Sequence, residues 1–106
     1  MSVPEISVQE LDALRKANAD IFILDVRNQN EFDVCNLNGY LLPFAELTAR
    51  INELDPNAHI IIHCHAGGRS RRATEYLMGQ GFKKVFNLRG GITAWANEID
   101  PKMAKY

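Results

Sequence analysis

Short apolar runs alternate with amphipathic stretches along this chain, and this alternation restricts the folds that it can adopt. Segments with the character of buried strands, rich in β-branched or apolar residues, lie at 21–24, 60–62 and 85–88. Segments with helical periodicity separate them, including 7–16 and 70–80. Strands that alternate with helices of about ten residues favour a parallel sheet with helices on both faces. We therefore expect an α/β fold with a central sheet of about five strands, and one domain over residues 1–106.

Local signals place several helix boundaries. The segments Ser7–Glu10 and Asn28–Glu31 each have the spacing of a capping box, in which the first side chain caps the helix and the glutamate reaches back. Leu47, Ile51 and Leu54 fall at the spacing of one buried helical stripe. That spacing predicts a continuous helix over this segment.

Composition excludes several classes of protein. Hydrophobic residues make up 46% of the 106 residues and charged residues 24%, as in ordinary globular domains. No apolar run approaches the roughly 20 residues that span a bilayer, so we expect no membrane association. The N-terminal segment 1–5 has neither the basic region nor the apolar core of a signal peptide, which favours a cytoplasmic location.

The net charge of −1 conceals an uneven distribution. Residues 1–62 carry ten acidic and four basic residues, whereas residues 63–106 carry three acidic and eight basic ones. The basic residues are typical either of a solvated helix face or of a positive field that attracts an anionic substrate or an acidic protein. They form no long run and no pattern of interleaved aromatic residues suggests base stacking, so we expect no nucleic-acid partner.

The segment from Cys64 to Ser70 carries the strongest functional signal. Cys64 follows a predicted strand and precedes His65, Ala66 and two glycines, and then come Arg69 and a residue suited to the start of a helix. A thiol attacks as its thiolate, which backbone N–H groups, a helix N-terminus and an arginine would all stabilise. Gly67 and Gly68 allow the close turns of such a loop. The alternative is a buried cysteine followed by an ordinary turn, which leaves the glycines and the arginine unexplained.

The length of this loop separates two kinds of chemistry. Four residues lie between Cys64 and Arg69, a shorter loop than cysteine phosphatases use around a phosphate. A phosphatase also needs a general acid, and no carboxylate in or beside the loop is an obvious candidate. The spacing therefore favours a persulfide sulfur over a phosphoryl group.

Three segments together resemble the rhodanese homology domain. They are Ile23–Arg27 followed by Glu31-Phe32, the loop Cys64–Ser70, and Asn87–Trp95. The resemblance runs from about Glu5 to Trp95 and implies a rhodanese-like α/β sheet and transfer of sulfane sulfur through a persulfide on Cys64. It also assigns substrate binding to His65, Ala66, Gly67, Gly68, Arg69 and Ser70.

Two further segments narrow the resemblance. Residues 31–35, and the ending 95–101 with Tyr106, are similar to the rhodanese domain fused behind the adenylating enzymes of molybdopterin and thiamine biosynthesis. There the domain supplies sulfur to a small ubiquitin-like carrier protein, so a carrier is a possible partner. Residues 1–106 include no adenylating domain, so the substrate and the partner stay open. Asn36–Tyr40 departs from the family pattern at a turn, where we expect altered packing.

The positions of the remaining candidate residues in the predicted strands suggest their roles. Asp25 and Arg27 end a predicted strand on the same rim, where we expect them to pair and brace the loop; the alternative is that Arg27 reaches the substrate. On a strand, His63 and His65 would share one face while Cys64 points to the other. The three side chains could not bind one metal ion, so we expect no metal site. His63 is expected to be a satisfied strand-end residue. Cys35 is expected to be a small packed residue, with a redox role as the alternative.

We therefore expect a sulfurtransferase in which Cys64 takes sulfur from thiosulfate or a persulfide donor and passes it to a thiophilic acceptor. Neither a metal nor an organic cofactor is needed for these steps. The alternatives are a non-enzymatic binding module of the same fold and, less favoured by the loop length, an arsenate reductase or phosphatase.

Overall fold

The computed structural model describes residues 3–106, so Met1 and Ser2 of the segment assessed for a signal peptide lie outside the described residues. Its centre is a sheet of five strands in the order β1-β5-β4-β2-β3, in which every neighbouring pair is parallel. The strands are β1 (Glu5–Ile6), β2 (Phe22–Asp25), β3 (Tyr40–Leu41), β4 (Ile60–His63) and β5 (Val85–Leu88). This confirms the predicted α/β fold with a parallel sheet.

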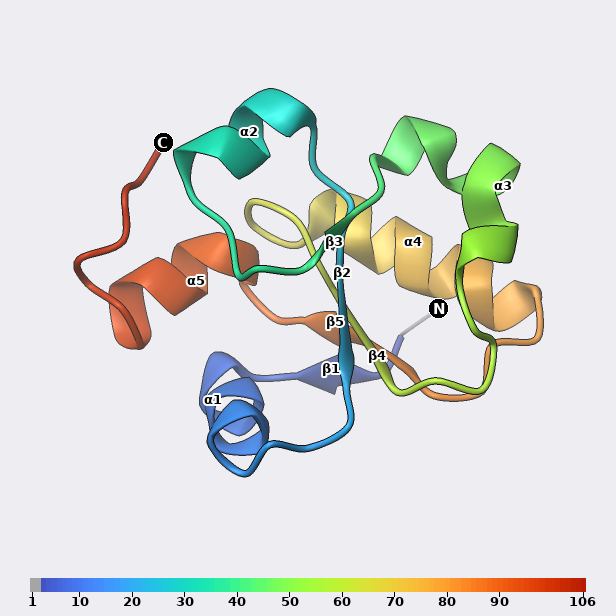
Figure 1. Ribbon diagram of the computed structural model, residues 1–106, viewed down its shortest axis with the longest axis horizontal. Coiled ribbons are helices and arrows are strands. Elements are labelled where there is room, and N and C mark those ends of the chain that lie inside the picture. Colours follow the sequence, from blue (N-terminus) through green and yellow to red (C-terminus); the bar gives the residue numbers. More distant parts are fainter. Residues whose placement is uncertain (1–2) are drawn as a thin grey trace.

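Helices cover both faces of the sheet (Figure 1). One face packs on α1 (Val8–Lys16) and α5 (Gly91–Glu98), with Leu11, Ile61 and Trp95 in the shared core. The other face packs on α4 (Gly68–Gly79) and the segment around α3 (Leu47–Arg50). The central strand β4 is buried along its whole length, because it contributes side chains to both cores.

The predicted helix around Leu47 is wrong as one continuous element. The structure breaks it into a 3-10 turn at Phe44–Glu46, the single turn α3, and a second 3-10 turn at Ile51–Glu53. Leu47 and Leu54 still enter the core, and Ile51 packs against it. Turns with slightly different pitch keep the same apolar spacing, so the spacing alone does not distinguish them from a regular helix.

The two predicted capping boxes appear at the predicted helix starts. Ser7 Oγ accepts from the Glu10 N–H and Glu10 Oε1 accepts from the Ser7 N–H at the start of α1. Glu31 likewise accepts from the Asn28 N–H at the start of α2 (Gln29–Val34). The short helix α2 lies beyond the carboxyl end of β2, beside the C-terminal segment of the chain (Figure 1). Within residues 3–106, no helix is both long and apolar enough to cross a membrane.

Candidate active site

Cys64 lies at the carboxyl end of the central strand β4, where the loop to α4 begins. Only 2% of the residue is exposed. Its Sγ accepts a hydrogen bond from the Gly67 N–H over 3.1 Å, because Gly67 has a φ of +120° that turns the chain back toward the sulfur. Gly67 is also the N-cap of α4, so the positive end of that helix faces the thiol. The loop is thus shaped to hold a negatively charged sulfur.

The N-terminus of α5 holds the loop from behind. The Ile92 N–H donates to the Cys64 carbonyl and the Thr93 N–H to the His65 carbonyl, each over 3.0 Å. Gly91, at φ +60°, passes so close to both carbonyls that a Cβ there would lie 2.7 Å from the Cys64 oxygen. These contacts bind the first two loop carbonyls to α5 and so fix the start of the loop.

Ser70 is fully buried on the first turn of α4, with its hydroxyl 3.4 Å from Cys64 Sγ. The same hydroxyl lies 3.2 Å from the Gly67 carbonyl and 2.6 Å from Asn87 Oδ1 in β5. Ala66 and Gly68 are exposed at the rim of the loop. The predicted loop residues therefore surround one sulfur, although their contacts with a substrate stay predictions.

Arg69 forms a bidentate ion pair with Glu31 at the rim of this loop. Two guanidinium nitrogens donate to the two carboxylate oxygens over 2.7 and 2.8 Å. These hydrogen bonds lower the pKa of Glu31 to about 2, and the same contacts raise the pKa of Arg69. Both nitrogens of the Arg69 fork are taken by protein, so contact between this guanidinium and a substrate anion stays a prediction.

Asp25 and Arg27 form a second ion pair, fully buried beneath α2. Arg27 donates to both oxygens of Asp25, at 2.9 and 2.7 Å, and neither side chain is exposed. Arg27 also donates to the carbonyls of Glu31 and Cys35, at 3.3 and 2.8 Å. Burial opposes its charge, but the hydrogen bonds to Asp25 and Tyr106 raise the pKa of Arg27 overall. The pair fixes α2, and therefore Glu31, relative to the end of β2.

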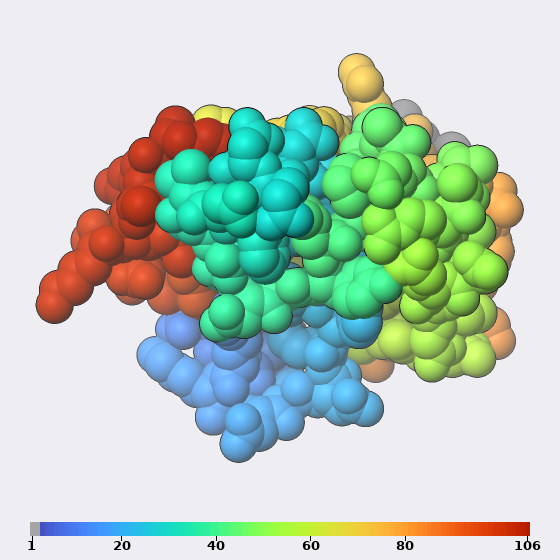
Figure 2. Space-filling view, turned by 45° about the horizontal axis from the view of Figure 1, so that its top comes forward, coloured from blue at the N-terminus to red at the C-terminus, as the bar shows by residue number. Residues whose placement is uncertain are grey.

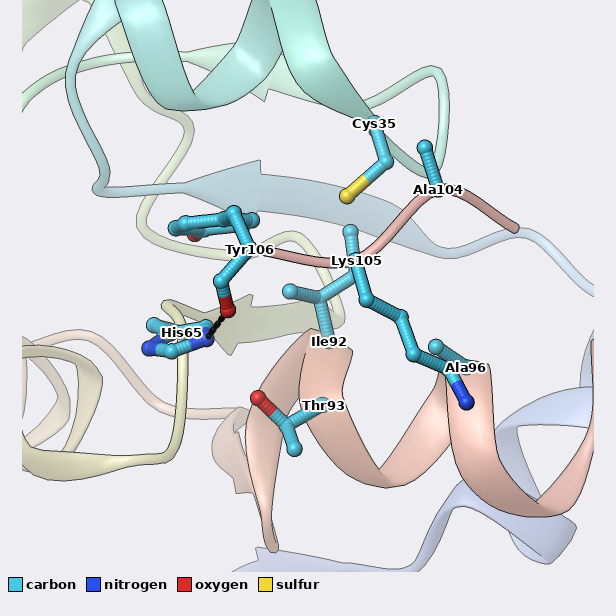
Figure 3. Close-up of a pocket in the computed structure, with 8 residues that line it drawn as sticks. All are labelled: Cys35, His65, Ile92, Thr93, Ala96, Ala104, Lys105 and Tyr106. Atoms are coloured by element: carbon cyan, nitrogen blue, oxygen red, sulfur yellow. Dashed lines mark hydrogen bonds between the residues drawn. The ribbon is translucent and has the colours of Figure 1, made fainter. Parts of the chain in front are cut away.

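The C-terminal segment folds back over this site. Figure 2 shows it, in red, against the region of α2. The Tyr106 ring stacks on His65 with centroids 4.3 Å apart, and His65 Nε2 lies 3.1 Å from the Tyr106 carbonyl oxygen (Figure 3). The Tyr106 hydroxyl accepts from Arg27 and donates to Glu31, each over 3.0 Å. One residue therefore links the loop and both ion pairs.

A cavity of about 130 Å³ lies between this C-terminal segment, α5 and the loop (Figure 3). Cys35 and Tyr106 line it, and His65 forms the wall toward the loop. Cys35 is half-buried and, like Cys64, a free thiol. Residues 3–106 contain no cluster of three or more histidine, cysteine or acidic side chains that could hold a metal ion.

His63 ends β4 as predicted but is only partly satisfied, with its Nδ1 3.4 Å from the Cys64 carbonyl oxygen. It is fully buried beside Asp25, its partner in the register of β4 and β2. Burial lowers the pKa of His63 to about 4, so the ring is neutral at pH 7. Its Nε2 lies 3.6 Å from the Asp25 carboxylate and makes no hydrogen bond within the described part of the chain.

The structure thus brings Asp25 and Arg27 to the same rim as the Cys64 loop, as the parallel sheet predicts. The residue-level interpretation missed three side chains at the site: Glu31, Asn87 and Tyr106. The sequence marks Glu31 only as a helix cap and as part of a resembling segment, and it marks the other two only as parts of such segments. Each contacts the site across a long separation along the chain, up to 79 residues for Tyr106 and Arg27.

Comparison with known proteins agrees with this geometry. A family model described as a rhodanese-like domain matches residues 7–98. A sulfurtransferase of Allochromatium vinosum is 34% identical over 108 residues, covering 96% of each chain. A Bacillus subtilis protein, YrkF, whose name describes a candidate sulfur carrier, is 36% identical over 100 residues, 93% of this chain. The chain spans about half (54%) of the length of that relative.

A solved structure of a sulfurtransferase has the same fold as this chain. The thiosulfate sulfurtransferase of Pseudomonas aeruginosa superposes with a TM-score of 0.80 at 33% identity, covering 90% of this chain and 19% of that one. The order of the strands, the cysteine loop after β4 and the match over most of the sequence agree with one another. The chain belongs to the family of rhodanese-like domains.

Proposed function

We propose that this chain is a sulfurtransferase that carries sulfane sulfur as a persulfide on Cys64. The observation that carries the proposal is the position of Cys64 Sγ, which accepts the Gly67 N–H at the N-terminus of α4. A thiolate there is stabilised by the helix and by the loop N–H groups. The sulfurtransferase relatives support transfer of sulfur as the general role.

In the first half-reaction, the Cys64 thiolate attacks the outer sulfur of thiosulfate. A bond forms between Sγ and that sulfur while the bond to the sulfonate sulfur breaks, and its electron pair leaves with sulfite. With a persulfide donor the same displacement releases the donor's thiolate. The Gly67 N–H, which already donates to Cys64 Sγ, lies where it can stabilise negative charge on the sulfur.

In the second half-reaction, an acceptor attacks the terminal sulfur of the Cys64 persulfide. The bond between the two sulfurs breaks, and its electron pair restores the Cys64 thiolate. A thiol, cyanide or a small sulfur-carrier protein can serve as the acceptor, and the sulfur-carrier name of the B. subtilis relative favours a protein carrier. The exposed rim at Ala66 and Gly68 is the side from which such an acceptor would approach.

Residues 1–106 would act as one domain in a reducing, cytoplasmic setting, where Cys64 and Cys35 stay free thiols. This placement is part of the proposal, since the reaction needs Cys64 unoxidised at the start of each cycle.

Intact-mass measurement after treatment with thiosulfate tests the proposal. We expect the protein to gain one sulfur, roughly 32 Da, and to lose it on addition of cyanide. Cys64→Ser should gain nothing, whereas the matched variant Cys35→Ser should gain the same mass as the unmodified chain. An unchanged mass, or a gain that survives Cys64→Ser, would contradict it. Binding of a carrier protein without any sulfur uptake would instead favour the non-enzymatic module.

A further inference from the structure

Asn87 is a buried polar side chain that the proposed reaction does not yet use. It lies in β5, the strand next to β4, and only 3% of it is exposed. Its amide nitrogen donates to Glu5 Oε2 over 3.3 Å, and its amide oxygen accepts from the Ser70 hydroxyl over 2.6 Å. Glu5 can only accept, so it turns the amide nitrogen toward itself and the amide oxygen toward Ser70.

The Ser70 hydroxyl has one proton and three acceptors within reach. Asn87 Oδ1 is nearest at 2.6 Å, the Gly67 carbonyl follows at 3.2 Å, and Cys64 Sγ lies at 3.4 Å. Only one of these can receive the proton at a time. The short distance to Asn87 favours the amide oxygen while Cys64 is a neutral thiol. A negatively charged sulfur is a stronger acceptor and competes for the same proton.

We propose that Asn87 is a positioning residue that sets how readily Ser70 donates its hydroxyl hydrogen bond to the charged sulfur of Cys64. Asn87 does not touch the sulfur; it acts by holding the Ser70 proton in the thiol state. Ionisation of Cys64 must break the contact between Ser70 and Asn87 before the hydroxyl can turn to Sγ. This proposal rests on the proposed function, because it takes Cys64 as the nucleophile.

Other groups around Cys64 also influence its charge. They are His63 in β4, His65 in the loop, the pair of Arg69 and Glu31, Tyr106 in the C-terminal segment, and Glu5 behind Asn87. Substitution of Asn87 alters none of these side chains chemically. A change transmitted through Ser70 must disappear when the Ser70 hydroxyl is removed, whereas a change caused by altered packing or by Glu5 must remain.

The experiment is the pH profile of Cys64 alkylation by iodoacetamide, which needs no sulfur donor. It compares the unmodified chain, Asn87→Ala, Ser70→Ala and the double variant, all with Cys35→Ser so that one thiol reports. We expect Asn87→Ala to lower the midpoint pH by about half a unit to one unit, as one hydrogen bond to a charged group predicts. In the Ser70→Ala background the same substitution should leave the midpoint unchanged.

An equal shift in both backgrounds, or no shift in either, overturns the proposal. Asn87→Asp is the second variant if Asn87→Ala does not fold, since it keeps the size of the side chain and the acceptor toward Ser70. It should raise the midpoint, and by more with Ser70 present than with Ser70→Ala, where only the added charge acts. Equal rises overturn the proposal as well. Failure of Cys64 to take sulfur from thiosulfate contradicts the proposed function alone, because alkylation is measured without it.

Discussion

Two arginine–carboxylate pairs meet at the hydroxyl of Tyr106, and they differ in burial. The pair of Asp25 and Arg27 is completely buried, whereas the side chains of Arg69 and Glu31 are 35% and 13% exposed. Both have two short hydrogen bonds in a fork. The same chemistry therefore occurs once inside the scaffold and once at the rim of the cysteine loop.

The difference in burial gives the two ion pairs different structural roles. Arg27 satisfies a buried carboxylate, a carbonyl within α2 and the carbonyl of Cys35 just after it, so the scaffold depends on Arg27. A buried charge without its partner is expensive, while a partly exposed pair is screened by water. The rim pair instead connects α2 to the first turn of α4, next to Cys64. We expect the first pair to govern stability and the second to govern the shape of the loop.

The largest expected effect is from Arg27→Leu. It leaves the Asp25 charge buried without its partner and removes two hydrogen bonds to α2, so the free energy of unfolding should fall by about 3–5 kcal/mol. Urea unfolding followed by circular dichroism measures the loss. The control is Arg50→Leu, since Arg50 forms exposed ion pairs with Glu46 and Glu53. A smaller loss for Arg27→Leu than for Arg50→Leu would contradict the division between the two pairs.

An intermediate effect is expected for Glu31, and it depends on pH. Its pKa is about 2 in the folded chain against an ordinary 4.5, so the unfolded chain binds more protons between these values. The stabilisation is complete above about pH 4.5 and is lost as the pH falls toward 2. Urea unfolding across this range should show a smaller acid-induced loss for Glu31→Gln than for the unmodified chain.

Asp33→Asn is the matched control for that measurement, because Asp33 is an exposed residue of the same helix. It should retain the full acid-induced loss. If Glu31→Gln and Asp33→Asn behave alike, the rim pair does not stabilise the fold in the way described.

The smallest expected effect is from Tyr106→Phe. The ring can still stack on His65, but the hydroxyl that joins the two pairs is lost. We expect the free energy of unfolding to fall by about 1 kcal/mol, as one or two partly exposed hydrogen bonds predict. Tyr76→Phe, in α4 and half-buried against the core, should change the free energy of unfolding less. The hydroxyl does not connect the pairs energetically if Tyr106→Phe still costs the same when combined with Glu31→Gln.

The sequence predicted much of the fold because local and near-local patterns determine it. The apolar runs at 60–62 and 85–88 became β4 and β5, and the capping spacings marked α1 and α2 correctly. The apolar spacing around Leu47 did not reveal the change from 3-10 to α and back, because side-chain periodicity constrains pitch only loosely.

The site was predictable only in part, since its pairings are long-range. The loop motif located Cys64, and the parallel sheet placed Asp25 and Arg27 on the same rim. Nothing local signals that Glu31 meets Arg69 38 residues away. The burial of His63 likewise depends on the register of β4 against β2, which sets it opposite Asp25. Such contacts follow from how the elements pack, and periodicity does not encode them.

The close passage of Gly91 behind the loop has a consequence for how this domain can diversify. It holds the loop through the carbonyls of residues 64 and 65 and not through their side chains. Substitutions of the side chains at positions 65 and 66 therefore leave these backbone contacts in place. Position 91 has no such freedom, because any side chain there would collide with those carbonyls. The side chains at the rim of the loop and the backbone course of the loop can thus change independently of each other.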